Sequence, residues 1–161
     1  MALDISRVML GRVDGNTNYA TYRFPVTSGV TVTAGDFVYQ DAAGRITNSS
    51  IGGSRLVGMA EETATGNAGG TVSALVCIDP WMRYLLKNDN IGTTFAATHV
   101  LTNFDLIGAT GAQLVDTSTT GTSGQLLCLE YNPVIDPVST DITYGVFTVA
   151  EHILHTGSGA Q

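Results

Sequence analysis

The sequence predicts an all-β protein, a small β-sandwich or barrel built of one or two hairpin-rich modules with an extended N-terminal arm. Three observations predict this class. β-Branched and aromatic residues recur at strand spacing between short clusters of Gly, Asp, Asn and Ala, a pattern that is typical of hairpins. The 161-residue chain contains 19 glycines, which suit many turns. It contains no amphipathic helical run of three turns.

The first 22 residues are expected to form the arm. Residues 5–10 could be a short strand, and Asp14-Gly15 marks a turn-rich connector after it. An arm of this kind buries little by itself and needs an acceptor, either on its own domain or on a neighbour. Residues 19–26 then alternate as a strand, and Pro25 ends it or places it at a sheet edge because proline cannot donate to a ladder.

Residues 23–80 are predicted to form the first β-module, around which the chain is organised. Turn residues at 34–36 and 41–44 separate its short strands, and residues 63–70 are expected to be a flexible tip rich in Gly and Thr. The further strands expected here are Val30–Thr33, Phe37–Gln40, Arg45–Thr47, Arg55–Glu62 and Thr71–Ile78.

Residues 81–155 are predicted to form the second β-module, followed by a polar tail at 156–161. The segment at 82–87 could be a helical turn or a strand. The clearest strands are Gln125–Tyr131 and Tyr144–Glu151. Trp81, the only tryptophan, is expected to be a structural wedge between the two halves and not a ligand platform.

The two halves also share a pattern of residues that suggests a weak internal duplication. Phe104 is followed seven residues later by Gly111, as Phe37 is by Gly44. Each half then continues with an apolar strand that opens near a glycine. The alternative is simply two hairpin-rich modules of similar size.

Composition favours a component of an assembly. Apolar residues make up 43% of the chain but charged residues only 13%, against about a quarter in ordinary soluble domains. The net charge is −7 and the seven basic residues are scattered, so nucleic acid is not expected as a partner. No apolar run approaches the roughly 18 residues that span a bilayer, so no membrane is expected. The N-terminus does not look like a signal peptide, so synthesis in a cytoplasm is expected.

No catalytic residue, cofactor or metal site is expected, so the protein is not predicted to be an enzyme. Asp36 and Asp41 lie beside Gly or Ala, where turn formation is a better explanation than a catalytic pair. Residues 14–18 are oxygen-rich but lack the distal glutamate of a calcium loop, which favours an Asx turn. Cys77 and Cys128 each lie in an apolar strand and are expected to be buried free thiols. The histidines lack metal or triad spacing; they are His99, His152 and His155.

At this level of detail the chain resembles a known family, the head decoration proteins of tailed phages, also called capsid cement or stabilising proteins. In these proteins a Gly-Asp-x-Val turn and a Gly-x-Ile hairpin lead into a strand of the type Val-Gly-Val-Ala and then a strand that opens at a glycine. The matching segments here are Gly35–Val38, Gly44–Ile46, Val57–Glu61 and Gly70–Ile78. Segments that resemble the second half of the longer members are Ala96–Gly108, Gln113–Asp116, Gly124–Pro133 and Val146–Leu154.

The resemblance, which covers residues 27–154, implies a jelly-roll or β-tulip-like module and a structural protein of the virion. Such proteins bind the outside of the expanded head as trimers, so the implied partners are the major capsid protein and further copies of the chain. By its position, the arm is the part implied to reach the shell or a neighbour. Its candidate contact residues are Ile5, Val8, Met9, Leu10, Arg12, Tyr19 and Tyr22.

Two other classes of function stay open on the sequence alone. A glycan-binding or host-binding β-module on a virion surface would have the same composition and would expose clustered aromatic residues. A small hydrolase would need a polar pocket that joins His99 or His152 to a carboxylate.

Overall fold

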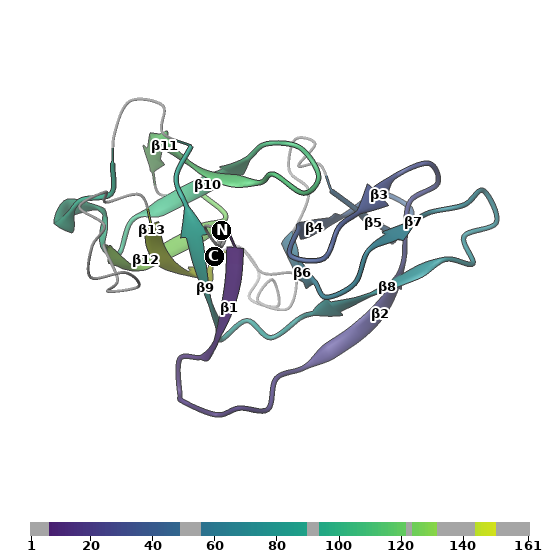
Figure 1. Ribbon diagram of the computed structural model, residues 1–161, viewed down its shortest axis with the longest axis horizontal. Helices are drawn as coiled ribbons and strands as arrows, with labels where there is room; N and C mark the ends of the chain where they lie inside the picture. The colour runs from purple at the N-terminus through teal and green to yellow at the C-terminus, as the bar shows by residue number, and fades with distance from the viewer. Residues whose placement is uncertain (1–6, 49–55, 90–93, 122–123, 132–143, 151–161) are drawn as a thin grey trace, which may run out of the picture. The chain divides into compact units, whose positions relative to one another are not determined.

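The computed structural model of the protein describes residues 7–48, 56–89, 94–121, 124–131 and 144–150 (Figure 1). Within these residues the regular structure is β-strand, with one short 3₁₀ helix and no α-helix, which confirms the all-β prediction. The chain divides into two compact units. The first module comprises Thr17–Pro80 with Ala109–Gln113, and the second comprises Trp81–Gly108 and Leu114–Ala150 with the N-terminal segment up to Asn16.

The first module is built on a five-stranded antiparallel sheet with the order β2-β8-β6-β4-β5. These strands are β2 (Thr21–Pro25), β4 (Phe37–Gln40), β5 (Ile46–Thr47), β6 (Leu56–Ala60) and β8 (Ser73–Cys77). A small second sheet pairs β3 (Thr31–Val32) with β7 (Ala64–Thr65). Directly after β2 the chain returns to the opposite edge, where Val26 forms a parallel bridge with Ile46. The sheet therefore curls back on itself.

The second module contains a six-stranded antiparallel sheet with the order β1-β9-β13-β12-β10-β11. Its elements are β1 (Arg7–Arg12), β9 (Met82–Lys87), the 3₁₀ helix η1 (Ala97–His99), β10 (Asn103–Ile107), β11 (Leu114–Gly121), β12 (Leu126–Tyr131) and β13 (Tyr144–Val149). Directly after β9, Asn88 forms a parallel bridge with Val115 in β11, and the Asp89 N–H donates to the Val115 carbonyl at 3.0 Å. This sheet also curls toward closure.

The two modules have the same topology once β1 and the β3-β7 pair are set aside. When the strands of each module are numbered in chain order, the order of neighbouring strands across both sheets is first, fifth, fourth, second, third. In each, a parallel bridge joins the residue after the first strand to the third strand. The duplication suggested by the spacing of Phe and Gly therefore has a structural counterpart in the strand order.

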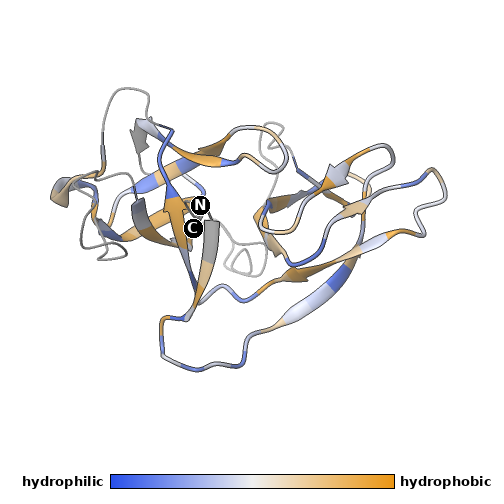
Figure 2. Ribbon diagram, viewed as in Figure 1, coloured by the Kyte–Doolittle hydropathy of each residue, from blue (hydrophilic) through white to orange (hydrophobic). Residues whose placement is uncertain are grey.

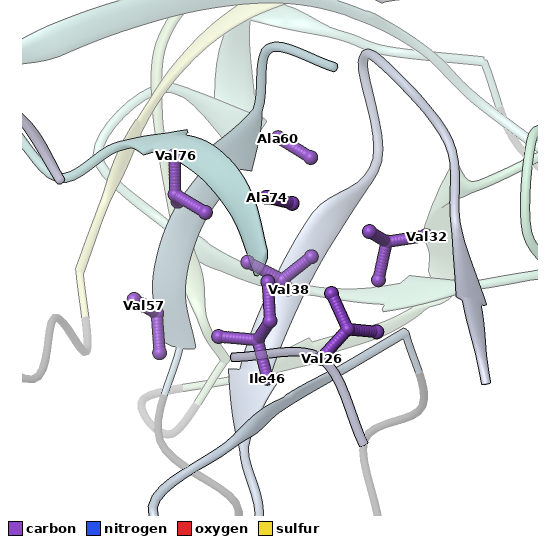
Figure 3. Packing of buried hydrophobic residues seen from close by; sticks show 8 residues of the cluster. All are labelled: Val26, Val32, Val38, Ile46, Val57, Ala60, Ala74 and Val76. Carbon is purple, nitrogen blue, oxygen red and sulfur yellow. The ribbon is translucent and has the colours of Figure 1, made fainter. Parts of the chain in front are cut away.

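The cores of the two modules differ in chemistry. The first module buries a cluster of aliphatic side chains (Figure 3), namely Val26, Val32, Val38, Ile46, Val57, Ala60, Ala74 and Val76. The second buries the rings of Phe95, Phe104 and Phe147, whose centroids lie 5.3 to 5.9 Å apart. Hydrophobic residues follow the strands of both modules, for example along β9 (Figure 2). Consecutive residues are buried in β4, β6 and β9, so these strands are covered on both faces.

The chain between β10 and β11 belongs to the first module. The Gln113 side chain is buried and pairs with the backbone of Phe37: its Oε1 accepts from the Phe37 N–H at 2.6 Å, and its Nε2 donates to the Phe37 carbonyl at 2.9 Å. The Gly111 N–H donates to Oδ1 of Asp36 at 2.8 Å. A side chain thus takes the place of a neighbouring strand at the start of β4.

Two local expectations from the sequence need correction. Trp81 is not a buried wedge, because its side chain is largely exposed. Residues 63–70 are not only a flexible tip, since they contain β7, which pairs with β3. The N-terminal segment has its acceptor within the chain, one of the two alternatives that the sequence left open, because β1 pairs with β9. The ambiguous segment at 82–87 is a strand.

Candidate functional site

The first half of the predicted contact segment lies at an edge of the second module's sheet. Met9 pairs with Tyr84 and is partly buried, and Val8 pairs with Leu85. Leu10 falls where the register shifts between Met9 and Gly11, so it occupies a bulge, and its side chain is 42% exposed. Ile5 lies outside the described residues.

Two further apolar side chains lie beside this strand. The Val13 N–H donates to the Trp81 carbonyl at 2.8 Å, which extends the β1-β9 pairing by one residue. Val13 is 50% and Trp81 55% exposed. We refer to Leu10, Val13 and Trp81 as the edge patch. Neither Val13 nor Trp81 was among the contact residues predicted from the sequence. Val13 stands between two charged residues, a position that indicates a surface turn.

Arg12 and Asp14 form a fork-like pair next to the edge patch. Nε and Nη2 of Arg12 donate to the two carboxylate oxygens at 3.1 and 3.0 Å, and the Asn16 N–H donates to Oδ1 at 3.0 Å. The hydrogen bond from Arg12, followed by that from Asn16, lowers the pKa of Asp14. The carboxylate therefore closes an Asx turn, the arrangement that the sequence favoured over calcium binding.

The second half of the predicted segment belongs to the first module. Tyr22 lies on β2, the edge strand of the sheet, is 61% exposed, and packs edge-on against Phe24 with the ring centroids 5.0 Å apart. Tyr19 precedes β2 and is 39% exposed. The negative charge of Glu61, and then partial burial, raise the pKa of Tyr19. On β2, Arg23 forms a two-pronged ion pair with the carboxylate of Glu62.

Exposed large apolar side chains are concentrated in this part of the chain. Those found in the described residues are Leu10, Val13, Tyr19, Tyr22, Trp81 and Leu101. Four of them lie between residues 10 and 22 of the sequence. Trp81 lies directly beside Val13 in the structure, and Leu101 is the exception. Leu10, Tyr19 and Tyr22 were predicted as contact residues, and their exposure makes them available to a partner.

The two carboxylates considered for catalysis are occupied by turn hydrogen bonds. Oδ2 of Asp36 accepts from the Thr33 N–H at 2.9 Å, while Oδ1 accepts from Gly111. Asp41 accepts from the Thr27 hydroxyl at 2.7 Å and from the N–H groups of Ala43 and Arg45, each at 2.8 Å. Burial alone would raise the pKa of Asp41, but these hydrogen bonds and the Arg45 charge together lower it.

The histidine and the cysteines in the described residues have structural surroundings. The ring of His99 packs against Phe95 and Phe104, and its Nδ1 accepts from the Ala96 N–H at 3.2 Å. Cys77 and Cys128 are free and buried, as predicted. Burial raises the pKa of the Cys128 thiol to about 11. No three His, Cys, Asp or Glu residues within the described ranges are grouped to hold a metal ion. His152 and His155 lie outside those ranges.

No protein family model, curated protein or solved structure matches this chain. Across the part of the chain that the structure describes, no helix has the length and apolar character to span a membrane. The fold and surface therefore define a two-module, all-β protein in which, among the described residues, most exposed large apolar side chains lie on or beside the edge strands β1 and β2.

Proposed function

We propose that the protein is a structural component of a tailed-phage head, which binds the outside of the expanded shell and stabilises it against the pressure of the packaged DNA. The observation that carries the proposal is the concentration of exposed apolar side chains in the segment that the resemblance assigns to contact. Exposed apolar patches on soluble proteins commonly mark interaction sites. The partners proposed are the major capsid protein and further copies of this chain as a trimer, on the outer surface of the virion.

The outer edge of β2 suits the contact with the shell. Within the described residues β2 pairs on one side only, with β8, so its other side can accept an extended strand. Tyr22, whose ring packs on the partly buried Phe24, offers an exposed aromatic surface on one face of β2, and the Arg23–Glu62 ion pair offers a polar surface on the other. A capsid segment with alternating apolar and polar residues would match both faces.

The charges near these edges also fit a broad, weakly charged interface. Arg12 is paired with Asp14 and Arg23 with Glu62, so each of these two arginines is neutralised within the chain. Stabilisation then works by mass action: a protein that binds the expanded shell and not the compact one lowers the free energy of the expanded state with every copy bound. This mechanism needs no catalytic group.

The direct test is co-sedimentation of the purified protein with expanded and with unexpanded heads of its parent phage. We expect saturable binding to expanded heads only. The double variant Tyr19→Ser, Tyr22→Ser should bind at least about tenfold more weakly, which corresponds to about 1.4 kcal/mol. The matched control is Tyr131→Ser, which removes a partly exposed tyrosine on β12 and should bind normally. Absence of binding to either form of head would reject the proposal.

A substitution is preferable to truncation of the arm. Removal of residues 1–18 would delete β1 and uncover β9, so lost binding could then reflect a damaged sheet.

A glycan-binding or host-binding module is the second candidate, and the exposed ring of Trp81 favours it. Aromatic rings stack on sugars, and the Arg12–Asp14 pair beside the edge patch supplies polar groups. A glycan array separates the two functions. Glycan binding that is lost in Trp81→Ala, together with no binding of the wild-type protein to phage heads, would support this candidate.

A further inference from the structure

The turn that contains the 3₁₀ helix η1 is closed by a histidine ring. The His99 N–H donates to the Ala96 carbonyl at 2.9 Å, and in return the Ala96 N–H donates to Nδ1 of His99 at 3.2 Å. Each residue therefore supplies one donor and one acceptor to the other. An Nδ1 atom that accepts a hydrogen bond carries no proton, so the ring is neutral and has its proton on Nε2.

The same turn holds a strained residue. Leu101 has a backbone φ of +63°, and it is the one non-glycine residue with positive φ in the described part of the chain. Left-handed backbone is unfavourable for a leucine. The Leu101 N–H donates to the Cys128 carbonyl at 2.8 Å, and the hydroxyl and N–H of Thr102 donate to the His99 carbonyl at 2.6 and 3.1 Å. Strain at Leu101 therefore favours opening of the turn, and the hydrogen bonds on either side of Leu101 oppose it.

The His99 ring is partly buried against the aromatic core of the second module. Its centroid lies 6.4 Å from that of Phe95 and 5.4 Å from that of Phe104, with interplanar angles of 87° and 76°. Both phenylalanines are fully buried. Apolar surroundings of this kind disfavour the charged form of an imidazole ring.

No charged group of the described residues is bonded to His99. Its ring contacts are with Phe95 and Phe104 and its side-chain hydrogen bond is with Ala96, and within the described ranges it takes part in no ion pair. The helix η1 packs against β12, and Phe104 lies on β10. The titratable side chains of these two strands, none of which bonds to the His99 ring, are Asp105, Cys128, Glu130 and Tyr131. Neutralisation of a charge on the ring would therefore have to come from solvent.

We propose that His99 is a proton-operated latch, in which protonation of Nδ1 opens the segment of residues 95–102 and releases Leu101 from its left-handed conformation. Protonation places an N–H on Nδ1 directly opposite the Ala96 N–H, and two donors cannot bond to each other. The closing hydrogen bond requires the neutral ring, so its stabilisation is present at high pH and is lost as the pH falls. Imidazole groups ordinarily titrate near pH 6.5, so the device works between about pH 8 and pH 5. It does not depend on the proposed function.

The test uses the double variant His152→Gln, His155→Gln, in which His99 is the only histidine of the chain. Nitrogen NMR of the ring at pH 8 should show the proton on Nε2. Hydrogen exchange, corrected for the intrinsic effect of pH, should show that protection of the Leu101 amide falls at least about tenfold between pH 8 and pH 5, because one linked proton changes an equilibrium by up to about tenfold per pH unit. The Asp89 amide of the same module donates to the Val115 carbonyl at 3.0 Å and should keep its protection.

Two substitutions in the same background separate the acceptor from the ring. His99→Phe keeps an aromatic ring but has no acceptor, so the Leu101 amide should be weakly protected at pH 8 and at pH 5 alike. His99→Asn lacks the ring but its Oδ1 can accept from the Ala96 N–H at any pH. Protection of the Leu101 amide should then not depend on pH, and at pH 5 it should exceed that in His99→Phe.

The variant Leu101→Gly tests the contribution of strain, because glycine adopts positive φ without steric cost. The amide of residue 101 should lose less protection between pH 8 and pH 5 in this variant than in the histidine double variant alone. Attraction of a charged ring to Phe95 and Phe104 would instead hold the turn closed in acid. The inference would be overturned by a ring proton on Nδ1 at pH 8, by Leu101 protection that is equal at pH 8 and pH 5, or by an equal loss of protection at Asp89.

Discussion

The first strands of the two modules hold equivalent places in the same topology but differ in what covers them. In the second module β9 is flanked by β13 on one side and by β1 on the other. In the first module β2 pairs with β8, and no strand of the described residues lies on its outer side. The covering strand β1 comes from a segment about 70 residues earlier in the chain than β9. Among the described residues, the same topology therefore has its first strand paired on both sides in the second module and on one side in the first.

The cores differ as clearly as the edges. The first module contains a cluster of aliphatic side chains in addition to the buried rings of Phe37 and Tyr39, whereas in the second the rings of Phe95, Phe104 and Phe147 pack against one another. Each module also contains one buried free thiol, Cys77 in the first and Cys128 in the second. Alkylation of each cysteine, measured by mass spectrometry, can therefore report the opening of each module separately.

Loss of an aromatic ring should have the largest effect and should separate the two cores. Phe104 packs edge-on against Phe95 and Phe147, so Phe104→Ala should destabilise the second module by about 4 kcal/mol. Val38→Ala in the first module should lose only about 2 kcal/mol, because it removes two methyl groups. Urea unfolding followed by alkylation of Cys77 and Cys128 measures both effects. Equal destabilisation by the two variants would contradict a difference between the cores.

A methyl group at the glycine in or next to the fourth strand of each module should lower the stability of that module. A Cβ on Gly58 in β6 would lie 1.8 Å from the Cys77 carbonyl oxygen, and one on Gly124 just before β12 would lie 2.5 Å from the Phe104 nitrogen. Both contacts are with backbone, so we expect Gly58→Ala and Gly124→Ala to lose about 3 kcal/mol each in urea unfolding. Gly69→Ala, where the nearest atom is 3.8 Å away, is the control and should be nearly neutral. A neutral Gly124→Ala would show that the equivalence of the two glycines is superficial.

The sequence indicated the first module better than the second because local turn chemistry defines it. Asp36 and Asp41 cap their own turns, and β4 between them has the predicted bounds Phe37–Gln40. The residues at 82–87 were ambiguous because MRYLLK has no clear period, and only pairing with β1 and β13 makes them a strand. Long-range register is not encoded in a local pattern.

The same limit explains which surface residues were missed. Exposure of Leu10, Tyr19 and Tyr22 followed from their position in a turn-rich segment that could not bury them. Trp81 was expected to be a structural wedge between the two halves, but it is 55% exposed. Leu101 gave no signal, since its strain comes from hydrogen bonds to Cys128, which lies in a different strand.

The Gln113 side chain ties the β10-β11 connection to the first module and has no equivalent in the β4-β5 connection. Gln113→Ala would leave the N–H and carbonyl of Phe37 without these partners in a buried place, so we expect a loss of about 2 kcal/mol. Hydrogen exchange should show faster exchange of the Phe37 amide. Gln113→Glu is the matched control, because it keeps the acceptor for the Phe37 N–H and loses the donor to the Phe37 carbonyl. An unchanged Phe37 exchange rate in Gln113→Ala would contradict the role of the tie.

The smallest effect expected is the pH dependence that the Asp41 turn gives to the first module. The β4-β5 turn is closed by the carboxylate of Asp41, whereas residues 108–113 between β10 and β11 contain no acidic residue. Asp41→Asn should cost about 1.5 kcal/mol at pH 7, since an ionised acceptor is lost. Because the folded-state pKa of Asp41 is lowered, its stabilisation is complete above the unfolded-state value of about 3.9 and disappears as the pH falls through the folded-state value.

Urea unfolding of wild type and Asp41→Asn between pH 7 and pH 2, followed by Cys77 alkylation, measures this difference. The two proteins should differ at pH 7 and converge at the acid end. Thr27→Val removes the shortest hydrogen bond to the carboxylate, so it should raise the folded-state pKa and move the convergence to higher pH. Opening of the second module, reported by Cys128, should not depend on either substitution. A gap between wild type and Asp41→Asn that persists at pH 2 would mean that the turn is stabilised by its backbone geometry and not by the charge of Asp41.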